Sequence, residues 1–402
     1  MKVLLVTQYF YPETFKSNDV AFELSRRGHD VTVLTGIPNY PEGRFTKGYG
    51  LFKNRRQEIN GVKIRRSFLI PRGKGGGLRL ALNYFSWACF ASLHALFLAL
   101  FYKYDVIFVH QTSPVMQGIP AVLVKKIQKI PLYFWVLDLW PESLESAGGI
   151  TNKRILRFFT GIVRFLYDHS TKILISSRGF EQSILEKGNY KDKLVYFPNW
   201  AEDVFTSKGL QDLPSLPSGF IVMFAGNIGE AQDFDHIMQA ALWLKNEKDI
   251  HFVFIGEGRK KEWVEHFIQS HHLEDTVHLS GRYPLECMPS FFARADVMLL
   301  ALKDEKIFNL TVPAKLQAYM ASGRPVVAMM NGEGAELIRK ARCGYAVAAG
   351  DHEGLAVKIK ELQTLSPDTR NQLGLNGKVF CEKNFHLNRC MDHLCSLFSP
   401  VR

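Results

Sequence analysis

Residues 198–235 contain the transition that decides the fold, PNWAEDVFTSKGLQDLPSLPSGFIVMFAGNIGEAQDFD. The stretch up to Gly219 is polar and contains three prolines, and it interrupts a regular alternation of apolar runs and helical patterns. The run FIVMFAG at 220–226 restarts that alternation. Short apolar runs of this kind are typical of strands that are buried on both faces of a parallel sheet. Residues 198–219 are therefore predicted to be a linker between two α/β domains.

Apolar runs rich in strand-forming residues occur on both sides of this linker. Before it lie VLLVT (3–7), VTVLTG (31–36), VIFVH (106–110), YFWVL (133–137) and ILISS (173–177). After FIVMFAG come HFVFIG (251–256), VHLSG (277–281), DVMLLAL (296–302), PVVAMM (325–330) and YAVAA (345–349). Helical patterns separate these runs, and the first helix is expected to begin at a cap formed by Ser17 or Asn18.

The alternation predicts an α/β fold with two Rossmann-like domains. We place the first at residues 1–200 and the second at 218–384, and we expect a C-terminal helix at about 385–402 to pack back on the first domain. Ligands of open parallel sheets bind at the carboxyl ends of the strands. The two domains are therefore expected to face a central cleft.

The net charge of +11 is unevenly distributed. Residues 1–200 contain 28 Lys and Arg against 14 Asp and Glu, and the remaining residues contain 22 against 25. A basic N-terminal half fits a phosphate-rich ligand, an anionic membrane or a nucleic acid. No motif that reads DNA or RNA is present, so a nucleic-acid partner is not expected. The six cysteines lack Cys-x-x-Cys spacing and the N-terminal apolar run is too short for a signal peptide, so we expect a cytoplasmic protein.

Residues 80–102 contain no charged side chain and are flanked by Arg79 and Lys103. This length admits a membrane-spanning helix, a buried helix of the first domain, or a helix whose aromatic face enters the membrane surface. A spanning helix would separate VTVLTG from VIFVH, which are expected to share one sheet. Residues 53–79 carry nine Lys or Arg against one Glu, and residues 151–170 again mix Arg with Phe and Leu. This composition favours contact with anionic lipid headgroups.

Glycines follow the strand that restarts the alternation, in the sequence FAGNIGEAQDFD. Glycines at a strand-to-helix turn let an anion approach backbone N–H groups and the positive end of the helix. We predict that Gly226, Asn227 and Gly229 contact the phosphates of a nucleotide; an ordinary glycine-containing turn is the alternative. Asp233 and Asp235 form an Asp-x-Asp motif, which we expect to cap the following helix. Neither a metal nor a cofactor is predicted.

Without a metal, the negative charge that develops on a nucleotide leaving group has to be stabilised by cations and helix termini. Three cations lie at or near predicted strand ends in the second half: Arg259 in GEGRKK, Arg282 in SGRYP and Lys315 in VPAKLQ. We predict that Lys315 and Arg259 are catalytic and that Arg282 lies near the base. The glycines of the GEGR turn, Gly256 and Gly258, are also predicted to contact the donor.

Six motifs occur in the order that one enzyme family shows. They are QYFYPETFKSNDVAFELSRRGHDVTVLTGIPNYPEG (8–43), DLWPES (138–143), FPNW (197–200), FAGNIG, GEGR and VPAKLQAYMASGRPVV (312–327). In these motifs, and over nearly its whole length, the chain resembles the retaining glycosyltransferases of family 4, which have the GT-B fold. It is most similar to their bacterial O-antigen and colanic-acid branch, which includes L-fucosamine transferases.

The resemblance implies a retaining transfer of a sugar from a nucleotide-sugar that is bound by the second domain. We expect a UDP-sugar, with an N-acetylated amino sugar such as FucNAc as one candidate. The first domain would bind the acceptor, an undecaprenyl-diphosphate-linked saccharide, at the cytoplasmic face of the inner membrane. The product would belong to a surface polysaccharide such as lipopolysaccharide O-antigen or capsule.

The chain departs from the family in one motif. Leu310 and Ala318 occupy the positions of the family's Glu-x7-Glu pair, whose second glutamate holds the donor ribose. Glu333 in NGEGAEL is a candidate substitute, and a glutamate that merely favours a helix start is the alternative.

Carboxylates and a histidine follow predicted strands of the first domain. Asp138 comes directly after YFWVL, where a carboxylate is suited to orient an acceptor hydroxyl, so we predict that it is catalytic; capping of the next turn is the alternative. Glu142 and His110 are predicted on the acceptor side, although a histidine at a strand end is often satisfied by the backbone. By resemblance, Glu13 and Asn18 in the loop PETFKSND also lie there.

Two other functions fit these observations. A nucleotide-sugar 2-epimerase of the same fold would not need an aromatic and basic acceptor surface. A non-enzymatic, basic membrane-binding protein would not need a donor-type second domain.

Overall fold

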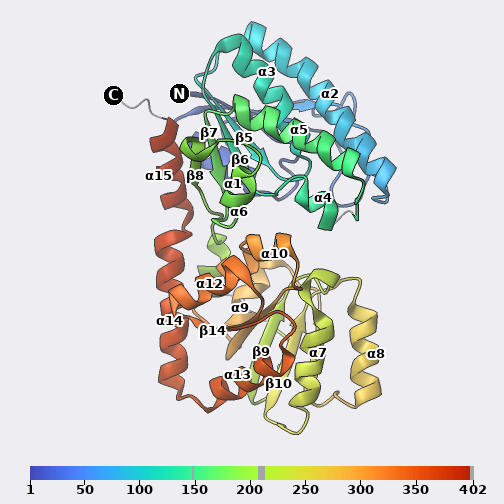
Figure 1. Ribbon diagram of the computed structural model, residues 1–402, viewed down its shortest axis with the longest axis vertical. Coiled ribbons are helices and arrows are strands. Elements are labelled where there is room, and N and C mark those ends of the chain that lie inside the picture. Colours follow the sequence, from blue (N-terminus) through green and yellow to red (C-terminus); the bar gives the residue numbers. More distant parts are fainter. Residues whose placement is uncertain (147–148, 207–212, 399–402) are drawn as a thin grey trace. The chain divides into compact units, whose positions relative to one another are not determined.

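The computed structural model describes residues 1–146, 149–206 and 213–398. The chain forms two compact units, one of Met1–Phe197 with Met391–Arg402 and one of Pro198–Cys390. Each unit is built around one sheet that is covered by helices (Figure 1). The stretch that interrupts the apolar pattern after residue 198 belongs to the second unit.

The sheet of the first unit has eight strands in the order β3-β4-β2-β1-β5-β6-β7-β8. Their bounds are β1 Lys2–Val6, β2 Asp30–Gly36, β3 Arg56–Ile59, β4 Val62–Ser67, β5 Val106–Gln111, β6 Leu132–Val136, β7 Lys172–Ile175 and β8 Leu194–Tyr196. All neighbours are parallel except β3, which runs antiparallel to β4 at one edge. β5 and β6 are buried along their whole length, which is why the sequence shows them as continuous apolar runs.

The apolar pattern of the sequence does not predict β3, β4 or β8, because they are short or polar. β4 reads VKIRRS and buries Val62 and Ile64 in alternation with charged side chains. Its Arg66 is also buried and donates hydrogen bonds to the Tyr11 carbonyl and the Gln57 side chain, each at 2.7 Å. The basic segment 53–79 is therefore partly a sheet edge, and Arg66 is unable to contact a headgroup.

Helices cover the first sheet. They are α1 Lys16–Arg26, α2 Gly77–Phe101, α3 Ile119–Gln128, α4 Glu142–Ser146, α5 Lys153–His169 and α6 Phe180–Leu185. α2 packs against α3, and α3 against α5, so these three form one layer (Figure 1). α15 (Leu387–Phe398) joins this unit from Met391 onward, and its Phe398 ring lies 5.0 Å from the ring of Tyr133.

The predicted cap of the first helix is wrong. α1 begins at Lys16, and the preceding residue, Phe15, makes no side-chain cap. The Ser17 hydroxyl instead donates to the Tyr9 carbonyl at 3.1 Å. The Asn18 side chain accepts from the Tyr11 amide at 3.1 Å and donates to the Glu13 carbonyl at 2.8 Å. Both side chains therefore stabilise the loop before the helix.

α2 is the one helix of the described residues that is long and apolar enough to cross a bilayer. Only 33% of its most apolar window is buried, and its buried positions include Trp87, Ala91, Ala95 and Leu98. The strands before and after it, β4 and β5, belong to the same sheet. A helix that crossed a membrane would divide that sheet, so α2 is a helix of the folded unit with one exposed apolar face.

The sheet of the second unit has six parallel strands in the order β11-β10-β9-β12-β13-β14. Their bounds are β9 Phe220–Ala225, β10 Ile250–Ile255, β11 Val277–Gly281, β12 Val297–Ala301, β13 Val326–Met329 and β14 Gly344–Val347. The helices are α7 Phe234–Trp243, α8 Lys261–His271, α9 Met288–Phe292, α10 Lys306–Leu310, α11 Ala314–Ala321, α12 Gly332–Ala341, α13 His352–Thr364 and α14 Pro367–Asn384.

Both faces of the second sheet carry a core. In β9, Val222 and Phe224 pack into one apolar cluster, whereas Met223 and Ala225 pack into the other. Successive strand residues point to opposite faces, so a strand covered on both sides has to be apolar throughout. This explains the run FIVMFA, and β9 ends with it at Ala225, directly before Gly226.

Candidate functional site

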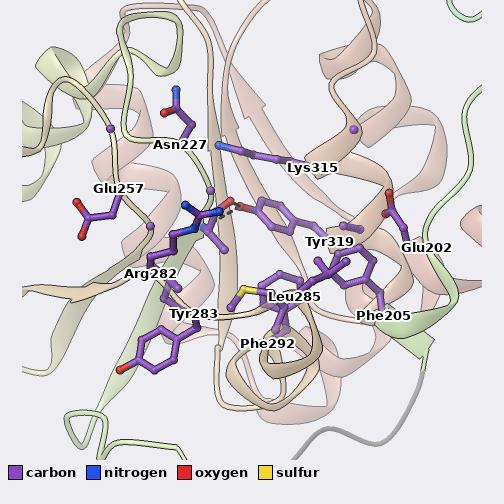
Figure 2. Close-up of a pocket in the computed structure, with 18 residues that line it drawn as sticks. Glu202, Phe205, Asn227, Glu257, Arg282, Tyr283, Leu285, Phe292, Lys315 and Tyr319 are labelled. Carbon is purple, nitrogen blue, oxygen red and sulfur yellow. Dashed lines mark hydrogen bonds between the residues drawn. The ribbon is translucent and has the colours of Figure 1, made fainter. Parts of the chain in front are cut away.

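A hollow of about 710 Å³ lies in the second unit, at the carboxyl ends of β9 and β10 (Figure 2). Its lining residues come from the loops after these strands, from the segment after β11, from α11 and from the stretch that follows residue 200. They are Glu202, Phe205, Ala225, Gly226, Asn227, Ile255, Gly256, Glu257, Gly258, Arg282, Tyr283, Leu285, Met288, Phe292, Ala314, Lys315, Ala318 and Tyr319. The carboxyl edge of a parallel sheet is where such folds bind ligands.

Two glycines shape the floor of this pocket. Gly226 has φ of 135° and Gly256 has φ of 146°, a region that residues with a Cβ rarely adopt. A Cβ on Gly256 would lie 1.8 Å from the Gly226 carbonyl oxygen, and a Cβ on Gly226 would lie 2.5 Å from Cε of Lys315. The amide of Gly226 already donates to the Ile255 carbonyl at 2.8 Å. The contribution of Gly226 is therefore space for Lys315 and for a ligand.

Lys315 is the most unusual group in the pocket. It is the second residue of α11, and its Nζ is buried at 3.8 Å from the centre of the Phe224 ring. Among the described residues, this Nζ has no hydrogen-bond partner. Burial lowers the pKa of Lys315 from 10.5 to about 7. A buried amine without an acceptor is costly for the protein alone, and an anion in the pocket would satisfy it.

The other predicted donor residues divide into two sets. Asn227, Arg282, Gly256 and Gly258 line the pocket. Arg259 is exposed and does not line it. The remaining two, Gly229 and Glu333, are also outside the lining.

The two positions at which the family has its glutamate pair differ in whether they line the pocket. Ala318 lines the pocket beside Tyr319, whereas Leu310 ends α10 outside the lining. Glu333 lies in the first turn of α12.

Asp233 and Asp235 lie at the start of the next helix, as expected, but the expected capping hydrogen bonds are wrong. Asp233 occupies the cap position of α7 with φ of 50°, but its carboxylate contacts Nδ1 of His236 at 2.8 Å and caps no backbone N–H. Asp235 forms an ion pair with Lys260 at 2.8 Å. No group of three or more potential metal ligands occurs within residues 1–146, 149–206 and 213–398.

In the first unit, Asp138 follows β6 and is held by its neighbours. Its carboxylate accepts hydrogen bonds from the hydroxyls of Ser113 and Ser143 and from Nε1 of Trp140. Burial raises the pKa of Asp138 despite these donors. Asp138 thus fixes the loop after β6, in addition to any contact with a ligand.

Glu142, at the start of α4, forms an ion pair with Lys187 at 2.5 Å and accepts from Ser183 at 2.6 Å. Burial raises the pKa of this carboxyl, but the charge of Lys187 and the two donors outweigh it, so the pKa lies below its ordinary value.

Glu13 and His110 lie inside the first unit. The Glu13 carboxylate accepts from the backbone amides of Asn39 at 2.7 Å and Tyr40 at 2.6 Å, and burial raises its pKa to about 7. His110, within β5, is 1% exposed and contacts the Thr7 hydroxyl at 3.4 Å. Burial lowers the pKa of His110 to about 3, so the imidazole is neutral.

No motif or pattern in the sequence predicted several of the residues that line the pocket. Phe205, Phe292 and Tyr319 form an aromatic wall, with ring centres 5.6 Å apart in each neighbouring pair. Glu202 and Phe205 belong to the stretch read as a linker. Tyr283 and Leu285 lie one and three residues after Arg282, and this proximity is the one feature of the sequence that pointed toward them.

Both parts of the chain match known families. Residues 17–200 match the glycosyl transferase 4-like domain, and residues 219–364 match the glycosyl transferases group 1 family. The chain is built from two glycosyltransferase domains. This agrees with the family resemblance inferred from the motifs.

Relatives with similar sequences are bacterial proteins. The chain is 32% identical over 244 residues to the probable glycosyltransferase WbjE of Pseudomonas aeruginosa, a match that covers 57% of this chain and 59% of WbjE. It is 24% identical to the putative colanic acid biosynthesis glycosyl transferase WcaI of Escherichia coli, over 80% of this chain and 82% of WcaI. The match with WbjE thus spans less than two thirds of that protein.

Solved structures with the same fold cover the whole chain. Sucrose-phosphate synthase from Thermosynechococcus elongatus has a TM-score of 0.75 at 13% identity, covering 99% of this chain and 98% of its own. Anabaena HepE, in complex with UDP and glucose, has a TM-score of 0.67 at 15% identity, covering 100% of both chains. The predicted GT-B architecture of two Rossmann-like domains is confirmed.

Proposed function

We propose that this protein is a retaining glycosyltransferase that moves a sugar from a UDP-sugar to a lipid-linked saccharide. The observation that carries the proposal is Lys315, a buried amine without a partner among the described residues, in the hollow of about 710 Å³ in the second unit. A diphosphate would provide the anionic oxygens that this amine lacks. Asn227 and the space above Gly226 complete the proposed phosphate site.

The proposed chemistry is dissociation of the sugar from the diphosphate with attack on the same face. The bond between the anomeric carbon and the phosphate oxygen breaks, and the acceptor hydroxyl forms the new bond to that carbon. The proton of this hydroxyl passes to the departing phosphate. Protonated Lys315 stabilises the charge that develops on the diphosphate, and its dry surroundings strengthen this interaction.

The relatives support the choice of donor and acceptor. HepE binds UDP and glucose, and WcaI is named for colanic acid biosynthesis. We propose by analogy a UDP-sugar, with an N-acetylated amino sugar such as FucNAc as the first to test, and an undecaprenyl-diphosphate-linked acceptor. The product would enter an O-antigen or capsule polysaccharide.

Peripheral binding to the cytoplasmic face of the inner membrane is part of the proposal. α2 carries an uninterrupted exposed apolar stripe of Leu78, Leu82, Phe85, Cys89, Leu93, Leu96 and Leu100. From Leu78 to Leu100 the chain advances by 22 positions in six steps, about 3.67 residues per step, which is close to the 3.6 of a straight α-helix. The stripe therefore runs along one side of α2 for about 33 Å. Such a face suits insertion parallel to a membrane surface.

Basic side chains lie in the same layer of helices as this stripe. α5 exposes Arg154, Arg157 and Arg164 together with Phe158, which is 57% exposed. The ring of Phe85 in α2 lies 6.4 Å from the ring of Phe159 in α5, so the two helices meet. Cations beside exposed aromatic residues fit a surface of anionic lipids.

A nucleotide screen tests the proposed donor site. We expect UDP to raise the melting temperature of the protein more than GDP, ADP or CMP at equal concentration. A ligand at 100 times its Kd stabilises a protein by about 2.7 kcal/mol. Absence of a shift with every nucleotide would refute the donor site and favour a non-enzymatic membrane-binding protein. Formation of a 2-epimer from the UDP-sugar without an acceptor would instead favour an epimerase.

A further inference from the structure

A second hollow, of about 470 Å³, lies in the first unit beside the carboxyl-terminal end of α2. Its lining comes from the amino ends of β1 and β2, from β4, from the last turn of α2 and from the segment that leads into β5. The strands β4, β2, β1 and β5 are neighbours in this order. Ligands of open parallel sheets usually bind at the carboxyl ends of the strands, so this hollow lies at the opposite edge of the sheet.

Cations dominate the lining of this hollow. Four of them contribute to it, Lys2, Lys63, Arg65 and Lys103, against the carboxylate of Asp30. Asp30 is already paired, because it lies 2.7 Å from Nζ of Lys63. The other three cations form no ion pair within the described parts of the chain. Uncompensated cations that surround one hollow create a positive potential that attracts an anion.

The strands bring cations and buried hydroxyls together. Lys63 and Arg65 are two residues apart in β4, so their side chains point to the same face of the sheet. Thr32 of β2 pairs with Lys63, and it is buried, as is Tyr104 in the segment before β5. Burial raises the pKa of Tyr104 to about 12, so its hydroxyl stays neutral at physiological pH. Amines, a guanidinium and hydroxyls are the donors that a phosphate accepts from.

Exposed aromatic side chains border the hollow on the side of α2. Phe101 is 70% exposed and Tyr102 is 45% exposed, and both belong to the lining. The ring of Phe101 lies 4.7 Å from the ring of Phe97, which is also exposed. Leu100, the last member of the α2 stripe, directly precedes Phe101. An apolar face that ends at a basic hollow matches a lipid, whose chains are apolar and whose headgroup carries the phosphate.

We propose that this hollow binds the phosphate group of an anionic phospholipid. The proposal rests on the membrane-binding part of the proposed function and deepens it, because it assigns the headgroup to one site. The phosphate oxygens accept from the cations of the hollow, and the lipid chains contact Phe101 and Tyr102. A choline headgroup would bring a positive charge against the same cations and should bind more weakly. A free phosphate is the other source of the same chemistry, but it has no chains for the aromatic side chains to contact.

The test is titration calorimetry of the full-length protein with three ligands. They are short-chain phosphatidylglycerol below its micellar concentration, short-chain phosphatidylcholine and inorganic phosphate. Phosphatidylglycerol should bind at least about tenfold more tightly than either of the others. The Arg65→Ala/Lys103→Ala double variant should lose about tenfold or more of this affinity, since two cations next to the phosphate are removed. Lys103 is exposed, so Lys103→Glu tests the same site without a change in the sheet, and a loss of similar size is expected.

The matched control is the Lys126→Ala/Lys191→Ala double variant. It removes two exposed lysines of the first unit that do not line the hollow, and it should bind phosphatidylglycerol within about threefold of the unmodified protein. The proposal is overturned if phosphatidylglycerol does not bind, or if both double variants lose the same affinity, which would indicate general surface charge. Equally tight binding of inorganic phosphate overturns the lipid as the ligand and assigns the hollow to a free phosphate.

Co-sedimentation with phosphatidylglycerol vesicles separates this proposal from the proposed function. Leu93→Asp should weaken vesicle binding and keep the affinity for the short-chain lipid, whereas Arg65→Ala/Lys103→Ala should weaken both. Full vesicle binding by Arg65→Ala/Lys103→Ala would refute the headgroup site and leave the α2 stripe as the membrane contact. Absence of vesicle binding by the unmodified protein would refute the membrane part of the proposed function, and with it the lipid as the ligand of the hollow.

Discussion

The two units place polar groups at the carboxyl ends of their sheets, but they use these groups in opposite ways. In the first unit, Asp138 is held by Ser113, Ser143 and Trp140, and Glu142 by Lys187. In the second unit, Lys315 is buried with no acceptor among the described residues. The bonded carboxylate oxygens of the first unit hold its loops in place, although Oε2 of Glu142 has no hydrogen-bond partner among the described residues. The amine of Lys315 makes no hydrogen bond there at all and so retains its capacity to bind a ligand.

The surfaces of the two units differ as well. The first unit exposes the long apolar stripe of α2, and the second unit contains the 710 Å³ hollow. We therefore expect substitutions in the first unit to change stability and membrane binding, and substitutions in the second to change catalysis.

The largest effect is expected for Lys315→Ala. Removal of the cation should lower the rate of UDP release from the donor sugar by about 10³-fold, or about 4 kcal/mol, because the charge on the diphosphate is no longer stabilised. Arg259→Ala provides the comparison, since this exposed cation lies outside the pocket lining, and it should lose less than threefold. An equal loss in both variants would show that Arg259 shares the clamp, and no loss in Lys315→Ala would remove Lys315 from the mechanism.

The next effect is expected in the stability of the first unit. Glu142→Ala leaves the buried Lys187 without its anionic partner, with only the hydrogen bonds to Ser183, so the free energy of unfolding should fall by about 3 kcal/mol. The control is Asp30→Ala, which breaks the exposed pair between Asp30 and Lys63, and it should cost less than about 1 kcal/mol. Chemical denaturation measures both changes. A stable Glu142→Ala protein with greatly reduced turnover would instead assign Glu142 to the reaction.

Much of the fold was predictable because fully buried parallel strands produce continuous apolar runs. β5 and β6 of the first sheet and β9, β10, β12 and β13 of the second are buried throughout and follow that rule, whereas the edge strands β11 and β14 are apolar runs that are only partly buried. β3, β4 and β8 do not follow the rule. The edge strand β3, for example, is mostly polar, and its side chains are alternately exposed and half-buried. Their composition resembles that of a charged loop, and only pairing with β2 and β7 identifies β4 and β8 as strands.

The lining of the pocket was predictable only in part. Gly226, Gly256 and Lys315 were predicted from residue type and position, because glycines at strand ends and a lysine at a helix start can be recognised from the neighbouring sequence alone. Glu202 and Phe205 come from a polar, proline-containing stretch, and nothing local places them beside α11. Arg259 is exposed and lies outside the lining, so its predicted role stays a prediction; position near a strand end does not determine whether a long side chain points into a pocket.

A smaller effect is expected on binding to the membrane surface. Leu93 is 61% exposed in the middle of the α2 stripe, and Leu93→Asp should weaken binding to vesicles that contain anionic lipid by about tenfold or more. Leu375→Asp is the control, because Leu375 is 50% exposed on α14 of the second unit. Vesicle co-sedimentation measures both variants. Equal binding of Leu93→Asp and the unmodified protein would exclude this face of α2 as the contact.

The smallest effect is expected in the pH dependence of UDP binding. It distinguishes the buried Lys315, whose pKa is lowered, from a lysine with the ordinary pKa of 10.5. Burial lowers the pKa of Lys315 to about 7, so above pH 7 the free protein holds a neutral amine and has to take up a proton when it binds a diphosphate. The Kd of UDP should therefore rise by up to about tenfold between pH 7 and pH 8, equivalent to about 1.4 kcal/mol.

The stability of the free protein should change in the opposite direction over the same range. Between pH 7 and the unfolded pKa of 10.5 the unfolded state binds the proton and the folded state does not, so this group increases stability as the pH rises. Lys315→Ala should remove both trends, and calorimetry with UDP and denaturation at pH 7 and pH 8 measure them. A Kd that is constant across this interval in the unmodified protein would mean that Lys315 is already protonated in the empty pocket, which would place an anionic partner beside it and weaken the contrast between the two units.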